Sequence, residues 1–427
     1  MAFPLLAGTF AMNAYALTDT WFVSRLGTLP LAAMGFTFPV IMLLTCVAMG
    51  IGTAVTTLVA HAIGRHEHEH AARLVTHGIA LIVGVTVVLS AAGYLLMTPV
   101  FTRLGADIQV RVFITAYMHT WYVGAVFMAL PMLGNGILIS MGDSRSASGL
   151  MIFGPLLNAI LNPIMIFGWL GCPALGIMGS ALATVVAQAM TTLWLLRLLH
   201  NKHRLLTRRP SRGNDFAATA RQITGFAIPS ILTMLLMPVS ATVITRLVSS
   251  FGHEAVAACG AAQRIEMFAF VIPMALGISL TPFMSQNFGA GRMDRVRIGH
   301  KLAIRFALVY GGVVAVVFFA LSPRLASVFT DDPKVSATLV SYVRIIAFGY
   351  GMMEVHRYCG FVLTGLHRPA STTMLNVIRV LVFLIPLSYF GTHLCGLKGL
   401  FVGRLTADVV SGCIGLIWVS RTLRLVP

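Results

Sequence analysis

The segment LVTHGIALIVGVTVVLSAAGYLLMT, residues 74–98, contains no aspartate, glutamate, lysine or arginine. It is longer than the roughly 20 apolar residues that an α-helix needs to cross a bilayer. Similar segments recur along the chain of 427 residues, of which 57% are hydrophobic and only 10% charged. Soluble domains carry about 25% charged residues, so this chain could not cover its surface in water. No long segment alternates polar and apolar residues, as the strands of a membrane barrel do. The composition therefore predicts an all-α integral membrane protein.

We expect twelve transmembrane helices. Their approximate bounds are 2–24, 31–62, 74–98, 112–140, 148–170, 174–199, 223–250, 255–288, 300–322, 336–366, 370–391 and 395–422. Most of the 30 lysines and arginines gather in alternate loops. Because basic residues are retained on the cytoplasmic side, both termini are expected in the cytoplasm, in a multi-pass protein of the inner cell membrane. The positional bias accounts for the net charge of +17 without a nucleic-acid partner.

The chain also repeats itself at a fixed offset of 225 residues. Coinciding pairs include Pro4 with Pro229, Thr20 with Thr245, Gly27 with Gly252, Gly52 with Gly277, and Gly64 with Gly289. Each repeat holds six predicted spans, and an even number gives both halves the same orientation in the membrane. We therefore expect two six-helix lobes, related by a pseudo-two-fold axis along the membrane normal and facing a central cavity. The N-lobe would cover residues 1–199, a basic cytoplasmic linker 200–222, and the C-lobe 223–427. Met1 aligns with Phe226, inside a span, which leaves open whether the natural chain begins before Met1.

Four carboxylates lie inside the predicted spans: Asp19, Glu266, Glu354 and Asp408. An ionised carboxylate at the centre of a transmembrane helix costs about 2.5–3.5 kcal/mol on insertion scales. Each therefore needs a partner, a proton or a water-filled cavity. Asp19 has no basic residue nearer in sequence than Arg25, and its repeat mate is Ile244, so the fold does not require an acid there. We interpret Asp19 as a transport residue rather than as an interhelical contact.

Asn158 and Asn162 are four residues apart, so both side chains lie on one helix face. Their amide oxygens could ligate a hard cation or bond to a protonated Asp19. Two asparagines could equally serve to join neighbouring helices. The residues alone leave these alternatives open.

Other candidate residues lie in the C-lobe. Arg264 and Glu266 are two positions apart and do not face one another, so each is expected to pair with another helix, where Arg379, Arg404 and Asp408 are available. A buried structural ion network is the alternative to a cation site there. Met237, Met274 and Met353 fall near the proposed cavity, where flexible side chains suit promiscuous apolar binding, although packing explains any single methionine.

Several other site classes are disfavoured. The run from His66 to His70 alternates histidine and glutamate, but it lies in a predicted loop with no further ligands to complete a metal site. Six single cysteines show no metal-ligand spacing. Neither a phosphate-binding loop nor a hydrolase or zinc-protease motif occurs. We expect no metal, no cofactor, no catalytic residue and no enzymatic activity.

Three motifs resemble the multidrug and toxic compound extrusion (MATE) family of the MOP flippase superfamily. They are Asp19–Gly27 followed by Leu31–Gly35, Gln286–Gly291 with Arg292 and Arg295, and Leu157–Pro163 followed by Gly176–Thr184. The resemblance covers essentially the whole chain. It implies a V-shaped antiporter of six plus six helices that exports lipophilic, often cationic compounds in exchange for sodium ions or protons.

The resemblance also assigns roles to particular residues. It makes Asp19 the coupling residue of the N-lobe, with Asn158 at the same ion site and Thr184 as a further ligand. Asn162 departs from the aspartate that many members carry, although the NorM branch also has asparagine there, so strong sodium binding in this lobe is in doubt.

Glu354 matches an acidic position of the C-lobe cation site in NorM-type members. The usual glutamate of the seventh helix aligns with Met237, so the site is incomplete unless Glu266 substitutes for it.

We expect an antiporter for amphipathic, cationic small molecules that acts as a monomer, with protons favoured over sodium ions as the coupling ion. The alternative is a flippase for a lipid-linked precursor, which would need a cationic cavity for pyrophosphate. Arg246, Arg264, Arg357 and Arg379 leave that alternative open. A receptor without transport activity fits poorly with the internal repeat.

Overall fold

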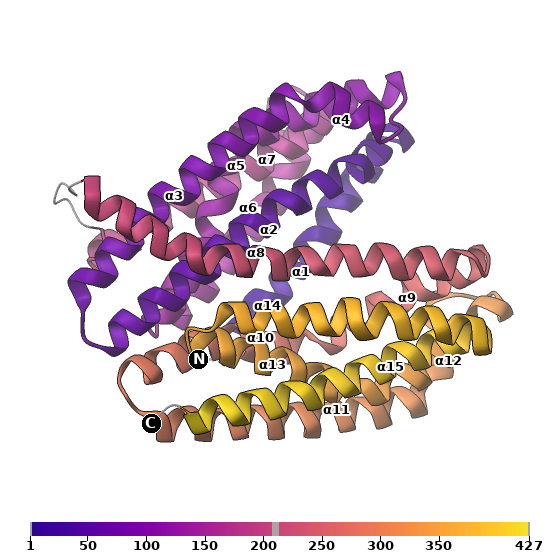
Figure 1. The fold of residues 1–427 in the computed structure, drawn as a ribbon. Helices are drawn as coiled ribbons and strands as arrows, with labels where there is room; N and C mark the ends of the chain where they lie inside the picture. The colour runs from indigo at the N-terminus through magenta and orange to yellow at the C-terminus, as the bar shows by residue number, and fades with distance from the viewer. Residues whose placement is uncertain (1, 207–212, 426–427) are drawn as a thin grey trace. The chain divides into compact units, whose positions relative to one another are not determined.

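The computed structural model describes residues 2–206 and 213–425, and nearly all of them are helical. No strand occurs in these two ranges. The chain divides into two compact units, residues 1–231 and 232–427, and the division falls within helix α8. Each unit is described by itself below, and Figure 1 labels the elements in chain order.

Unit 1 contains the first six predicted spans. Its elements are α1 (Ala2–Ser24), α2 (Thr28–Gly64), α3 (His68–Leu95), α4 (Met97–Arg103), α5 (Ile108–Ser140), α6 (Ser144–Phe167), η1 (Trp169–Gly171), α7 (Gly176–Arg197), η2 (Leu198–Lys202) and the first part of α8 (Gly213–Ser249). The third predicted span, 74–98, starts too late, because α3 begins at His68 and continues the helix through charged residues outside the apolar run.

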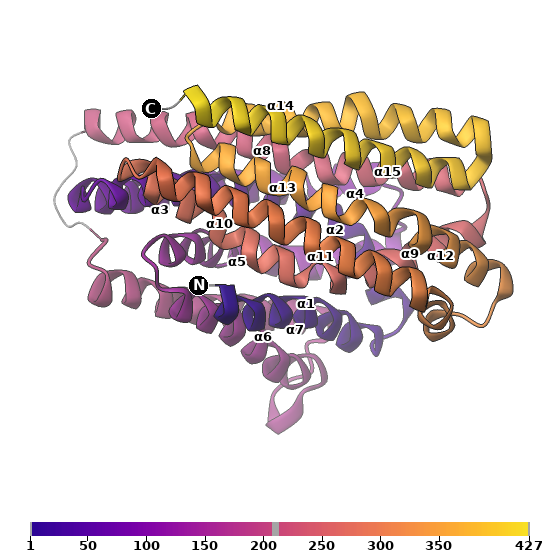
Figure 2. The same ribbon diagram turned by 90° about the horizontal axis from the view of Figure 1, so that it is seen from below.

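Unit 2 holds the remainder of α8 and the later spans. Its elements are α9 (His253–Ala269), α10 (Val271–Gly289), α11 (Met293–Phe329), α12 (Pro333–Ile346), η3 (Ala347–Gly349), α13 (Tyr350–Gly365), α14 (Pro369–Val377), η4 (Ile378–Leu384) and α15 (Ile385–Leu425). In Figures 1 and 2, α11 and α15 run beside α13.

The described helices account for twelve crossings. Nine continuous helical segments are long and apolar enough to span a membrane, and the bent pair α9–α10 makes a tenth. One of the nine, Pro369–Leu425, has 57 residues, or about 85 Å of helix, which is more than twice the bilayer core. Its backbone leaves the helical conformation at Cys395 and Gly396, which divides it into two segments that are each long enough to cross. Helix α1, with 23 residues, is also long enough to cross.

Both units pack around one central helix. Helix α5 contacts α2, α3, α6 and α7 in unit 1, whereas α13 contacts α10, α11, α14 and α15 in unit 2. The two central helices correspond in the repeat. The helices also contact one another at equivalent places in the two repeats. Ser140 donates a hydrogen bond to the Thr56 carbonyl in unit 1. In unit 2, Thr281, the repeat mate of Thr56, donates to the Phe361 carbonyl.

Four turns repeat the same backbone geometry at the offset of 225 residues. Each has a left-handed residue, namely His66, Gly142, Gly291 and His367, with φ of 62°, 78°, 69° and 62°. In each turn the next residue donates its N–H to the carbonyl five residues before it, as Glu67 does to Ala62 and Arg292 to Asn287. This is the Schellman pattern of a helix end. The repeat therefore extends to the backbone of the connections.

The turn between α5 and α6 also holds the segment that follows α7. Asp143 caps α6 by accepting from the Ser146 N–H, and its Oδ2 lies 2.6 Å from Lys202 Nζ and 2.9 Å from His203 Nε2. Burial alone would raise the pKa of Asp143, but the hydrogen bonds from Lys202, Ser146 and His203 outweigh it and hold the pKa well below its usual range. The start of the predicted linker is thus fixed to unit 1 by a charged contact.

The eighth predicted span, 255–288, is broken at Phe270, where α9 and α10 meet at a bend of 56°. Pro273 has no N–H to donate to the Ala269 carbonyl, and the Tyr310 hydroxyl donates to that oxygen instead, at 2.7 Å. The Tyr358 hydroxyl donates to the Pro273 carbonyl at 2.9 Å. Two tyrosines therefore satisfy the polar groups that the break exposes.

Candidate functional site

Asp19 lies on α1, facing the rest of unit 1, and only 7% of it is exposed. Its Oδ1 accepts hydrogen bonds from Asn162 Nδ2 at 3.0 Å and from Ser180 Oγ at 2.9 Å. No lysine, arginine or histidine among the described residues pairs with it. The N-terminal unit thus contains a buried acid held by neutral donors alone.

The two predicted asparagines lie on α6 as the four-residue spacing requires, and both are buried. Asn162 Nδ2 also donates to Asn158 Oδ1, and Asn158 Nδ2 donates to Thr184 Oγ1, each at 2.9 Å. The Thr184 hydroxyl in turn lies 3.3 Å from the Tyr15 hydroxyl. The structure therefore brings all four residues of the predicted N-lobe site into one chain of hydrogen bonds across α1, α6 and α7.

Sequence reasoning missed two members of this chain. Ser180 precedes Thr184 by four residues, and Tyr15 precedes Asp19 by four residues, so each shares a helix face with a predicted site residue. That spacing was the available signal.

Asn162 Oδ1 is buried without a hydrogen-bond partner in the described structure. The site thus offers one carboxylate, several donors and one free acceptor in a buried environment. Such an arrangement can take up a proton or one small cation.

In unit 2, Glu266 on α9 belongs to a charged and aromatic cluster. Arg404 Nη2, on α15, lies 3.0 Å and 3.1 Å from its two carboxylate oxygens. The hydroxyls of Tyr342 and Tyr350 donate to Oε1 at 3.0 Å and 3.2 Å, and Arg404 also donates to the Tyr342 hydroxyl. Glu266 therefore pairs with another helix, as predicted, and its oxygens are largely occupied by donors.

Glu354 and Asp408 each have an arginine of their own. Arg357 Nη1 lies 3.0 Å from Glu354 Oε1, although no N–H points at either oxygen, and both lack a hydrogen-bond partner in the described structure. Asp408 Oδ1 accepts from Arg379 at 3.0 Å and 2.6 Å. Among the described residues, no ion pair links Glu354 or Asp408 to Glu266, so the three acids lie in separate ion pairs.

Arg264 does not join these pairs. Its side chain is exposed on α9, and it makes no ion pair with any residue that the structure describes. The three methionines predicted to line a cavity differ from one another in exposure. Met353 is buried in the core of unit 2, whereas Met237 and Met274 are 65% and 44% exposed. The structure of the separate units does not bring these three side chains together.

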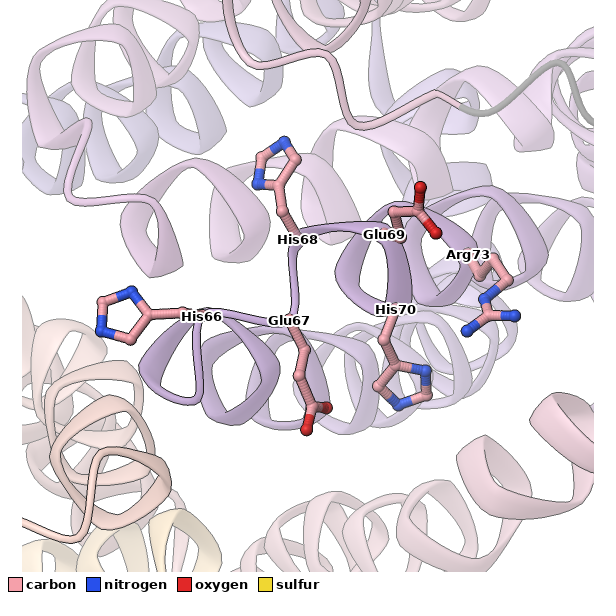
Figure 3. A pocket seen from close by; sticks show the side chains of 6 residues that line it. All are labelled: His66, Glu67, His68, Glu69, His70 and Arg73. Atoms are coloured by element: carbon pink, nitrogen blue, oxygen red, sulfur yellow. The ribbon is translucent and has the colours of Figure 1, made fainter.

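The run from His66 to His70 lines an open hollow on the surface of unit 1, together with Arg73 (Figure 3). Because the chain turns at His66, the side chains of His66, His68 and His70 point in different directions. Glu67 pairs with Arg65 at 2.9 Å. Within the two described ranges, no group of three or more histidine, cysteine or acidic side chains could hold a metal ion.

Comparison with known proteins gives consistent results. The MatE family model matches residues 4–164 and 229–390, two segments that begin 225 residues apart. The chain is 34% identical over 413 residues to the FAD transporter of Shewanella oneidensis, covering 96% of this chain and 91% of the relative. It is 25% identical over 451 residues to the multidrug resistance protein MdtK of Edwardsiella ictaluri, covering 99% and 94%.

A solved structure shows the same fold. The MATE transporter VcmN of Vibrio cholerae, in its bent form, has a TM-score of 0.93 and 29% identity, and the match covers 99% of this chain and 95% of VcmN. The resemblance seen in the sequence motifs is confirmed, and so is the all-helical membrane fold. The family is one of transporters rather than enzymes. The chain is a membrane transporter that belongs to the MatE family.

Proposed function

We propose that this transporter is an antiporter that exchanges protons for small amphipathic molecules through the Asp19 cluster. The observation that supports this most directly is a buried carboxylate without a cationic partner, bonded only to neutral donors from α6 and α7. A carboxylate in such surroundings must exchange between a charged and a neutral form as the cluster is hydrated and closed, and a proton is the smallest ion that neutralises it.

Protons are favoured over sodium ions by the direction of the hydrogen bonds. A sodium ion, as a hard cation, binds to several oxygen atoms. In the described structure, Asn162 presents its Nδ2 to Asp19, and Asn158 Oδ1 is occupied by that same Nδ2. The amides therefore present N–H donors to Asp19 rather than the oxygen atoms that a sodium ion needs. Sodium binding would require Asn162 to turn its free Oδ1 toward the ion.

The acids of unit 2 are proposed to have a structural role. Glu266, Glu354 and Asp408 each lie within 3.0 Å of an arginine nitrogen, so their charges are already compensated. A second coupling site would have to displace an arginine from one of them. We therefore place the coupling step in unit 1.

The orientation follows from the charge distribution. Basic residues cluster in the turns that precede α3 and α11, in the first turns of these two helices, and in the segment after α7. By the positive-inside rule, we propose that these turns and both termini lie in the cytoplasm, and that the protein resides in the inner membrane.

Two cargo classes are supported by the relatives. MdtK and other relatives are named for multidrug resistance, which favours the lipophilic, often cationic compounds expected from the sequence. The relative from Shewanella oneidensis is named an FAD transporter, and it is matched at higher identity than MdtK. FAD is a phosphate-bearing anion, so the two classes place opposite demands on the charge of the binding surface.

The test uses purified protein in sealed proteoliposomes. A pH gradient without sodium is imposed first, and then a sodium gradient at fixed pH on both sides. Efflux of a fluorescent substrate driven by the pH gradient, and abolished by a protonophore, is expected. Transport driven by sodium alone at fixed pH would overturn the proton mechanism.

A further inference from the structure

The membrane-spanning helices of unit 2 carry more positive than negative charge. Their three buried acids pair with Arg357, Arg379 and Arg404. Other arginines of this unit make no ion pair with any described residue, among them Arg246 on α8, Arg264 on α9 and Arg344 on α12. In unit 1, by contrast, the arginines of the spans lie within the first or last two turns, and the buried charge is that of Asp19.

Arg264 is the least expected of the three. It lies 11 residues after His253, where α9 begins, which corresponds to roughly 16 Å along the helix axis. An arginine in a membrane-spanning segment is costly unless it faces water or an anion. Glu266, two positions away, points into the unit, so Arg264 faces away from the core of unit 2.

The face of α9 that carries Arg264 has few large apolar side chains. Its exposed residues are Ala257, Gly260, Gln263, Arg264 and Phe268. A side chain added at Gly260 would meet no atom within 4 Å, so space lies beside the helix at this level. A face composed of small residues, an amide and a guanidinium fits an aqueous path.

The middle of α11, residues 308–317, shows how a lipid-facing surface looks in the same unit. Its exposed side chains there include Val309, Val313 and Val316, which are between 57% and 68% exposed. These branched aliphatic side chains suit contact with lipid tails. The contrast indicates that the two helices face different media.

The other two arginines have different settings. Arg344 donates to Ser322 Oγ at 2.9 Å, and its guanidinium lies 5.1 Å from the centre of the Phe319 ring. Arg246 lies on α8 with no such partner. The end of α8 and the body of α9 share one hydrophobic cluster, to which Val248 and Ala258 belong, so Arg246 and Arg264 are carried by adjoining helices.

We propose that Arg264 and Arg246 bind the phosphate group of an amphipathic anionic substrate, whose apolar part packs on Phe268. A guanidinium presents a planar set of donors that matches phosphate oxygens in pairs, and it binds most strongly where water is scarce. Phe268 lies one helical turn from Arg264 and is 55% exposed, so an aromatic surface adjoins the charge. This inference rests on the proposed export function and specifies its cargo.

The test compares two fluorescent probes that differ by one phosphate, riboflavin 5′-phosphate and riboflavin, with the cation ethidium as a third. Binding to the purified full-length protein is measured by fluorescence, and transport is measured in proteoliposomes under an imposed pH gradient. The variants are Arg264→Gln, Arg246→Gln and Arg264→Lys. Arg344→Gln is the matched control, because it removes an exposed arginine of the same unit that already has a partner.

For Arg264→Gln we expect about tenfold or more weaker binding and slower transport of riboflavin 5′-phosphate, because a charge-assisted contact is lost. Riboflavin and ethidium should be unaffected. Arg264→Lys should recover part of the loss, since it keeps the charge without the planar fork, and Arg344→Gln should behave as the wild type.

The inference is overturned if the wild type does not bind the phosphorylated probe, or if Arg264→Gln affects both flavins equally. It is also overturned if the arginine holds a lipid phosphate, in which case Arg264→Gln would change only melting in phosphatidylglycerol vesicles. Failure of the proposed function has a different signature, because the wild type would then move none of the three probes under a pH gradient.

Discussion

Ser180 donates a hydrogen bond to Oδ1 of Asp19 across 2.9 Å, from α7 to α1. The same oxygen accepts from Asn162 on α6, so three helices meet at one carboxylate oxygen. Within the described structure no side chain donates to the second oxygen, Oδ2. One oxygen of Asp19 is therefore fixed by the fold, and the other has no side-chain donor in the described structure.

Asp19→Asn should abolish substrate efflux driven by a pH gradient while leaving expression and melting temperature near the wild type. The amide keeps the size of the side chain and can accept at its oxygen from Ser180, but it cannot take up a proton. Size-exclusion chromatography and thermal unfolding serve as controls. Normal efflux by this variant would exclude the mechanism through unit 1.

Alanine at Asn158, Asn162 or Ser180 should reduce transport, because each residue supports the cluster around Asp19. Combining any of them with Asp19→Asn should add nothing further, since residues that act as one unit are not additive. Thr191→Ala, a buried threonine of α7 that donates only to its own helix, is the control. Independent losses that add up in the double variants would contradict a shared site.

Asp143→Asn should destabilise the protein by about 1–3 kcal/mol, because charged contacts to Lys202 and His203 are lost at the N-cap of α6. Burial by itself would raise the pKa of Asp143, but its hydrogen bonds hold the pKa below its usual range in the folded protein. Because the pKa is lower in the folded protein, the ionised carboxylate stabilises the fold at pH values above the unfolded pKa of about 3.9. This stabilisation disappears as the pH falls through the pKa of the folded protein.

The measurement is the difference in melting temperature between the wild type and Asp143→Asn from pH 8 to pH 3. It should stay constant down to about pH 4 and shrink below that. Asp294→Asn, at an exposed position in the first turn of α11, is the control. A difference that grows on acidification would show the opposite sign of linkage.

His66→Gly should raise stability by about 0.5–1 kcal/mol, because a left-handed backbone is strained for a residue with a side chain. His66 is exposed, and its side chain makes no hydrogen bond in the described structure. His367→Gly removes the same strain but also the contacts of its ring with Ser285 and Phe288. Thermal unfolding should therefore show a gain for His66→Gly and a smaller gain or a loss for His367→Gly. Equal changes would indicate that the side chains do not matter.

Tyr310→Phe should destabilise unit 2 by about 1–3 kcal/mol, because it leaves the Ala269 carbonyl without a donor inside the membrane. Tyr389→Phe is the control, since that ring is 48% exposed and makes only ring contacts. Hydrogen exchange at residues near the bend reports the effect locally. Unchanged exchange and melting would show that water replaces the hydroxyl.

Much of the fold could be predicted from the sequence, because long apolar segments and the repeated glycines act locally. The break at Phe270 was not foreseen, although Pro273 is a local signal for it; the donor that satisfies the Ala269 carbonyl, Tyr310, lies on another helix. In the site, the spacing of Asn158 and Asn162 placed both on one face. The contact of Asp19 with Ser180 joins residues 161 positions apart, and only the packing of α1 on α7 creates it. Likewise, no sequence rule decided which arginine pairs with Glu266.

The four left-handed turns also carry a record of descent. In the first repeat, histidine occupies the earlier turn and glycine the later one; in the second repeat, glycine comes first and histidine second. If the two halves descend from one duplicated ancestor, the residue in each turn has changed since the duplication while the shape of the chain has not. Inheritance at these positions has preserved a backbone conformation rather than an amino acid. Relatives of this protein can therefore be aligned by their turns where their residues are no longer identical.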